Sequence, residues 1–62
     1  MEVAADEFIA VGQWPSLVVA HEHALVVLAM NLDCRVVASD GDYLLEVEPA
    51  VGRKVREELD LY

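Results

Sequence analysis

Basic residues, aromatic residues and cysteine are all scarce in this chain of 62 residues. Four Lys and Arg residues stand against twelve Asp and Glu residues, so the formal net charge is −8 at pH 7. A surface of this sign repels the phosphates of nucleic acids and of anionic lipids. We therefore expect no nucleic-acid partner and no direct insertion into a membrane.

The single cysteine, Cys34, excludes an internal disulfide. A secreted domain of this size would normally need such bridges, so a reducing, cytoplasmic compartment is expected. The first residues carry Glu2 and Asp6 where a signal peptide has basic residues. The longest uncharged run, residues 8–20, is too short to span a bilayer.

Apolar residues are abundant by contrast, at 56% of the chain. That is above the ~45–50% of ordinary globular domains, and it is enough to offset the entropy lost on folding. A chain this short forms one domain, residues 1–62, with a small core. The apolar excess predicts a further contact, with a second copy or with the rest of a larger protein.

The first half of the chain predicts a strand followed by a helix. Residues 8–13 are β-prone and stop before a proline, whereas residues 1–6 are expected to be flexible. Residues 16–30 are rich in valine but have the length of a helix. Ser16 suits the start of this helix and Asn31 suits a left-handed cap at its end. We expect the helix to be buried over most of its circumference.

Residues 34–48 predict a β-hairpin, because Asp40-Gly41 lies between two β-prone runs. A two-residue turn fixes the register, and Arg35 then faces Glu46 as an opposite-charge pair. The other expected pairs are Ser39 with Asp42, Ala38 with Tyr43, Val37 with Leu44, and Val36 with Leu45. The expected core face carries Cys34, Val36, Ala38, Tyr43, Leu45 and Val47.

The last segment, residues 50–61, predicts an amphipathic helix. Its apolar positions recur at helical spacing and are Val51, Val55, Leu59 and Tyr62. The order is therefore β-α-β-β-α, an α+β fold. We expect a three-stranded sheet with two helices packed on one face, a half-ferredoxin-like arrangement.

Residues that could carry chemistry do not form a site in the sequence. His21 and His23 point in different directions on a helix, and two ligands leave a metal site incomplete. Cys34 lacks a partner base, and the acidic Asp33 beside it disfavours the thiolate. We expect a solvated or partly buried helix patch for the histidines and a buried core thiol for the cysteine.

Neither a calcium loop nor a phosphate loop is predicted. The carboxylates of Asp40, Asp42, Glu46 and Glu48 lack the spacing of a calcium-binding loop. The glycines, Gly12, Gly41 and Gly52, are isolated from one another. We expect no catalytic residue, no metal and no cofactor, so the chain itself is not predicted to be an enzyme.

Two explanations account for the positions of three apolar residues. Trp14 ends the first strand, and Val37 faces Leu44 on the side of the hairpin assigned to solvent. Local packing explains them, and a surface that binds a partner explains them too. We take Trp14, Val37 and Leu44 as the candidate interaction surface.

Three stretches of the chain resemble the cytosolic N-terminal domain of bacterial rhomboid proteins. These stretches are HALVVLAMNLDCRVV (residues 23–37), YLLEVE (residues 43–48) and VREELDLY (residues 55–62). Rhomboid domains carry an ALVLAAxGI helix ending, a short hairpin reading roughly xxLLV, and a last helix ending ELxxY. The similarity covers about residues 14–62. The chain departs from the pattern at Asn31, where glycine is usual, and in its more acidic hairpin.

This resemblance implies a parent protein that is an intramembrane serine protease. Its Gly-x-Ser-Gly motif and membrane histidine are absent from these residues, so no catalytic role is carried over. The chain would be a cytosolic accessory domain, tethered by downstream membrane spans and contacting the membrane-embedded remainder. A homodimer, including one formed by exchange of elements, is also implied. The alternative is a stand-alone cytosolic binding or signalling module of similar β-α-β-β-α fold.

Overall fold

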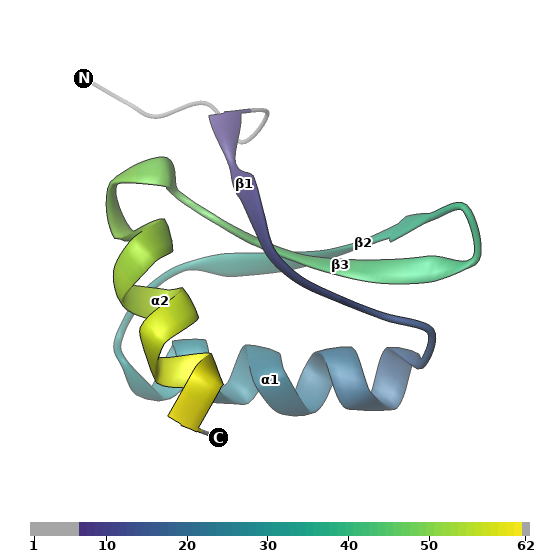
Figure 1. The fold of residues 1–62 in the computed structure, drawn as a ribbon, viewed down its shortest axis with the longest axis horizontal. Coiled ribbons are helices and arrows are strands. Elements are labelled where there is room, and N and C mark those ends of the chain that lie inside the picture. Colours follow the sequence, from purple (N-terminus) through teal and green to yellow (C-terminus); the bar gives the residue numbers. More distant parts are fainter. Residues whose placement is uncertain (1–6, 62) are drawn as a thin grey trace.

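The computed structural model describes residues 7–61 (Figure 1). Its elements, in chain order, are β1 (Ile9–Trp14), α1 (Leu17–Ala29), β2 (Cys34–Ser39), β3 (Asp42–Val47) and α2 (Pro49–Leu61). This is the β-α-β-β-α order that the sequence predicts. The flexibility expected for residues 1–6, and the core role expected for Tyr62, lie outside the described residues.

The three strands form one sheet in the order β1-β3-β2. The central strand β3 is antiparallel to both neighbours, so β1 and β2 are parallel but do not touch. Both helices pack against the same face of this sheet (Figure 1). Residues 7–61 therefore form two layers, and within this part of the chain no helix covers the other face of the sheet.

The β2–β3 hairpin has the predicted register at every pair. Asp40 and Gly41 have φ of 50° and 86°, the positive values that a tight two-residue turn requires. The Arg35 side chain donates from Nε to Glu46 Oε1 at 2.7 Å. Local turn chemistry and one cross-strand ion pair thus fix which hairpin residues face the helices.

A β-bulge interrupts β1 between Ala10 and Gly12. Ile9 lies opposite Val47 and Gly12 lies opposite Leu45, so Val11 is the extra residue. Because side chains alternate along a strand, the extra residue changes which positions face the helices beyond it. The strand prediction did not include this bulge, although a glycine inside a strand, here Gly12, is a known sign of one. The bulge turns Trp14 toward the core side of the sheet.

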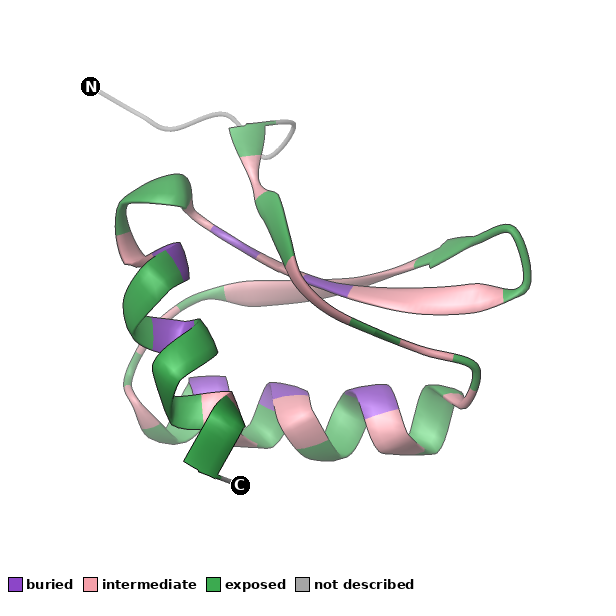
Figure 2. Ribbon diagram, in the orientation of Figure 1, coloured by how far each residue is buried: buried purple, intermediate pink, exposed green. Residues whose placement is uncertain are grey.

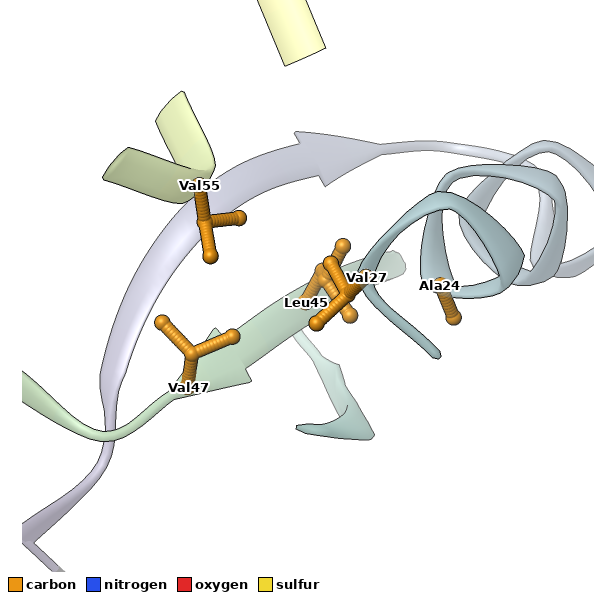
Figure 3. Packing of buried hydrophobic residues seen from close by; sticks show 5 residues of the cluster. All are labelled: Ala24, Val27, Leu45, Val47 and Val55. Carbon is orange, nitrogen blue, oxygen red and sulfur yellow. The ribbon is translucent and has the colours of Figure 1, made fainter. Parts of the chain in front are cut away.

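The core joins both helices to the central strand. Its largest fully buried side chains are Leu45, Val27, Val47 and Val55 (Figure 3). The small residues Ala20 and Ala24 are also buried, and they let α1 lie close to the sheet. Leu45 and Val47 come from the hairpin face that the sequence assigns to the core, and the prediction is confirmed for them. It is wrong for Ala38, which is exposed because it lies near the hairpin turn, at the end of the sheet.

The ends of α1 follow the predicted caps. Ser16 Oγ accepts a hydrogen bond from the Val19 backbone N–H at 3.3 Å. Asn31 has φ of 65°, a left-handed conformation that asparagine tolerates better than most residues. None of the helices within residues 7–61 has both the length and the apolar content that crossing a bilayer requires.

The expectation that α1 is buried over most of its circumference is wrong. Buried segments of α1 lie toward the sheet, and much of the opposite side is exposed (Figure 2). A two-layer fold covers a helix on one side only. The large apolar side chains left exposed, which we call the outer face of α1, are Leu17 (43% exposed), Val18 (70%), Leu25 (64%) and Leu28 (54%).

Candidate functional site

The two histidines of α1 point to different surroundings. His21 is exposed, whereas the ring of His23 stacks on Trp14 with centroids 4.1 Å apart and planes 22° apart. Nδ1 of His23 donates to the Val19 carbonyl oxygen at 2.8 Å. The structure does not bring the two imidazoles together, so they do not form a pair of metal ligands.

Cys34 lies half-buried at the start of β2, where it packs against the core. Its Sγ approaches the carbonyl oxygen of Ala24 on α1 at 3.9 Å. Burial, and secondarily the negative charge of Asp33, raise the pKa of the thiol above its ordinary value. Because the thiolate is the nucleophile, this setting lowers the reactivity of Cys34 at neutral pH.

Three acidic residues of the hairpin each have a separate local role. Asp40 forms the turn, Asp42 accepts a hydrogen bond from the Gln13 amide, and Glu46 pairs with Arg35. Across residues 7–61, no three His, Cys, Asp or Glu side chains lie close enough together to hold a metal ion. The same part of the chain has no pocket. The geometry there offers no concave site for a small molecule.

Trp14, one of the three candidate interaction residues, packs mostly inside the molecule. It is half-buried, its ring contacts His23, and it packs against the core cluster. A Cβ placed on Gly12 would fall within 3 Å of several atoms of the indole. In this position the indole fills space between β1 and α1, and only part of it reaches solvent.

Val37 and Leu44 lie opposite each other on the face of the sheet that carries no helix. Both are half-buried. On the same face, the Arg35 guanidinium lies 5.2 Å from the centroid of the Phe8 ring, a cation–π contact. The sheet thus covers part of this face with its own side chains.

The most exposed run of apolar side chains is the outer face of α1. Sequence reasoning missed it because α1 is apolar all round, so periodicity does not mark a solvent side. One signal was present: a fold with two layers must leave one side of each helix uncovered. The polar residues between Val18 and Leu25 are the exposed His21 and Glu22 and the half-buried His23.

Comparison of the chain with protein-family models, with curated proteins and with solved structures finds no match. The case for function therefore rests on the residues and on their arrangement.

Proposed function

We propose that this chain is a non-catalytic protein–protein interaction domain. The observation that carries the proposal is the outer face of α1, where Val18, Leu25 and Leu28 are each more than half exposed. Isolated exposed apolar residues are ordinary, whereas several of them on one side of a single helix favour a binding surface. The closed surface of residues 7–61, without a pocket or a three-residue metal cluster, is in line with a binding role.

We further propose that the domain is the cytosolic N-terminal part of a rhomboid-type intramembrane serine protease. The three stretches that resemble rhomboid domains fall on the end of α1, the β2–β3 hairpin and the end of α2. The resemblance therefore extends over most of the fold and is not confined to a single helix.

The charge of the domain suits such a location. Cytoplasmic loops of membrane proteins are rich in Lys and Arg, and a domain of net charge −8 is attracted to them. The role in this proposal is that of an accessory domain that contacts the membrane-embedded part or a neighbouring molecule. The catalytic serine and histidine belong to the membrane part.

Reading the gene beyond Tyr62 tests the family proposal. We expect several apolar runs of about 20 residues, one of them following a Gly-x-Ser-Gly motif. A stop codon directly after Tyr62 would contradict this proposal and would favour the stand-alone binding module of similar fold.

A further inference from the structure

We propose that the outer edge of β2 binds an extended segment of a partner protein that carries Lys or Arg at both of its ends. The segment would add a fourth strand to the sheet, beside β2 and on the side away from β3. This inference rests on the proposed role in protein–protein contacts and deepens it. It follows from the direction of the β2 backbone groups, from the difference between the two sheet edges, and from the charges that flank β2.

The backbone groups on one side of β2 face no other strand in the described part of the chain. The sheet order is β1-β3-β2, so β2 pairs with β3 alone. Ser39 and Asp42 close the two-residue turn, and such a closing pair exchanges both of its backbone hydrogen bonds. Bonded and non-bonded pairs alternate along an antiparallel ladder. The N–H and C=O groups of Cys34, Val36 and Ala38 therefore point away from β3, in line for a further strand.

The two edges of the sheet differ in how they are protected against a further strand. Natural sheets protect an edge with a β-bulge, a proline, a lysine or a covering element. The β1 edge has a bulge, and α2 packs against that strand. By contrast, β2 pairs with β3 without any register shift, and its sequence CRVVAS contains neither proline nor lysine. The β2 edge is therefore the regular one, and peptide strands add to regular edges.

An added strand would lie beside α1 as well as beside β2. Sγ of Cys34 approaches the Ala24 carbonyl oxygen at 3.9 Å, whereas His23, on the neighbouring side of the helix, stacks on Trp14 of β1. The Ala24 side of α1 thus lies toward β2. Leu28 is one helical turn beyond Ala24 on the same row of the helix surface, and it is 54% exposed. Apolar side chains on the helix side of the added strand would cover this part of the outer face of α1.

The residues that flank β2 carry the same charge at both ends. Asp33 comes directly before the strand and Asp40 directly after it, and both are exposed. The one basic side chain of β2, Arg35, is already paired with Glu46 at 2.7 Å. A strand of six residues spans about 20 Å, so the two free carboxylates are separated by about that distance. A partner segment with a basic residue at each end matches them.

A second copy of the chain fits this edge less well. If two β2 edges paired antiparallel about Val36, Asp33 of each copy would lie beside the turn that carries Asp40 in the other. Each copy also has a net charge of −8, so the two edges repel each other. A basic segment is attracted by the same charges. The flanking carboxylates therefore favour a partner that differs from this chain.

Titration with two synthetic peptides, each capped at both ends, tests the proposal. The first reads Lys-Val-Thr-Val-Thr-Val-Lys, and the second has Glu in place of both Lys residues. We expect the first to bind with a dissociation constant between about 10 µM and about 1 mM, and to bind more weakly as salt is raised. The second should bind at least about tenfold more weakly than the first, because its charges meet carboxylates. Equal binding of the two peptides would overturn the basic partner.

Amide hydrogen exchange shows where the first peptide binds. Exchange at Cys34, Val36 and Ala38 should slow when the peptide is added, because their N–H groups gain partners. Exchange at Arg35 and Val37, whose N–H groups point to β3, should change little. Slowing centred on another element, or no binding at about 1 mM peptide, overturns the proposal. So does slowing at the same three amides when the chain alone is concentrated, since a second copy would then occupy the edge.

Substitutions at position 38 test the edge from the side of the domain. Ala38 is exposed, and proline there removes an outward donor and sets its ring in the way of the peptide backbone. Ala38→Pro should weaken binding of the first peptide about tenfold, the effect of one lost hydrogen bond with its crowding. Ala38→Thr is the matched control, because it keeps the N–H and suits a strand; its binding should stay within about twofold of the natural chain. Unchanged binding by a folded Ala38→Pro chain overturns the edge.

A second variant decides the matter if Ala38→Pro does not fold. Asp33→Asn and Asp40→Asn together remove the flanking charges at two exposed positions, and asparagine suits the turn as aspartate does. This chain should bind the Lys peptide and the Glu peptide with nearly equal affinity. A preference for the Lys peptide as large as that of the natural chain would overturn the role of the two carboxylates.

The failure of this inference differs from that of the proposed function. A β2 edge that binds neither peptide leaves the outer face of α1 as the binding surface. It also leaves the family proposal, which depends on the gene beyond Tyr62. A stop codon after Tyr62 removes the family proposal and does not affect the result of the peptide titration.

Discussion

Trp14 shows how one glycine determines the position of a large side chain. The indole lies over Gly12, on the same side of β1, and it also stacks on the ring of His23 on α1 and packs against the core. A side chain at position 12 would occupy space that the indole fills. The strand and helix are thus joined through an aromatic pair that needs a glycine two residues before the tryptophan.

Gly12→Ala should therefore destabilise the fold by about 1–3 kcal/mol, the usual cost of overpacking. Gly52→Ala is the matched control: Gly52 is buried, and the one close contact of its added Cβ, at 2.6 Å, would be with Cδ1 at the flexible end of the Ile9 side chain. Alanine also gains about 0.8–1 kcal/mol of helix propensity over glycine at that site. Urea unfolding of both variants checks the difference, and equal losses would contradict this account of Trp14.

The raised pKa of Cys34 predicts that the stability of the fold decreases at alkaline pH. Burial and the charge of Asp33 raise its pKa in the folded chain. The folded state then holds the thiol proton more tightly than the unfolded state does. The stabilisation is complete below the unfolded thiol pKa of about 8.5 and is lost as pH rises through the folded value.

Unfolding of the natural chain and of Cys34→Ala, each measured at neutral and at alkaline pH, tests this sign. The natural chain should lose more stability than the variant on going to alkaline pH, since the other titrating groups are common to both. A difference between the two chains that does not change with pH would show that the thiol titrates alike in both states.

At the scale of elements, the hairpin is the part of the fold most fully encoded by local sequence. Gly41 has φ of +86°, and an added Cβ there would meet open space, so the cost of a substitution is conformational. Gly41→Ala should destabilise the chain by about 1–2 kcal/mol, the cost of a left-handed conformation. Asp40→Asn should change stability by less than about 0.5 kcal/mol, because asparagine accepts positive φ equally well. Thermal unfolding of the two variants checks the contrast.

The sequence predicted those elements whose signals are local. The hairpin register, the Ser16 cap and the left-handed Asn31 each depend on a few neighbouring residues, and each is confirmed. The bulge in β1 was not predicted, because Gly12, its one local sign, does not fix at which residue the register shifts. The exposure of α1 was also missed, since it depends on how many layers cover the helix.

The sequence predicted that a contact surface exists, but it did not identify the residues that form it. The apolar excess indicated a further contact, but the residues chosen, Trp14, Val37 and Leu44, include one that the bulge turns inward. No residue pattern distinguishes Leu25 from Val27, although the first is 64% exposed and the second is fully buried. The assembled fold was needed to separate them.

Substitutions on the two sides of α1 should change the free energy of unfolding by different amounts. Leu25→Gln should change the free energy of unfolding of the monomer by less than about 1 kcal/mol, because the side chain is largely exposed. Val27→Ala on the opposite side should cost about 2–3 kcal/mol, because it leaves a cavity among fully buried neighbours. Unfolding at dilute protein checks this, and a large loss for Leu25→Gln would place that residue inside the monomer core.

For the whole molecule, the central claim is that contacts with other molecules are made by the helix layer and not by the open face of the sheet. A chain of this size has two layers, a small closed core and a net charge of −8. The negative charges of two molecules repel each other at low salt. Once salt screens these charges, the outer face of α1 favours association. The account thus predicts a salt-dependent association confined to one helix.

The most direct measurement is an NMR dilution series of the backbone amides from about 1 mM to about 10 µM protein, a range that detects weak contacts between molecules. The account predicts that amides of α1 around Val18, Leu25 and Leu28 shift together with concentration and follow one dissociation constant. The amides of Val37 and Leu44 should stay fixed. Shifts centred on the sheet, or no shift at any position, would contradict it.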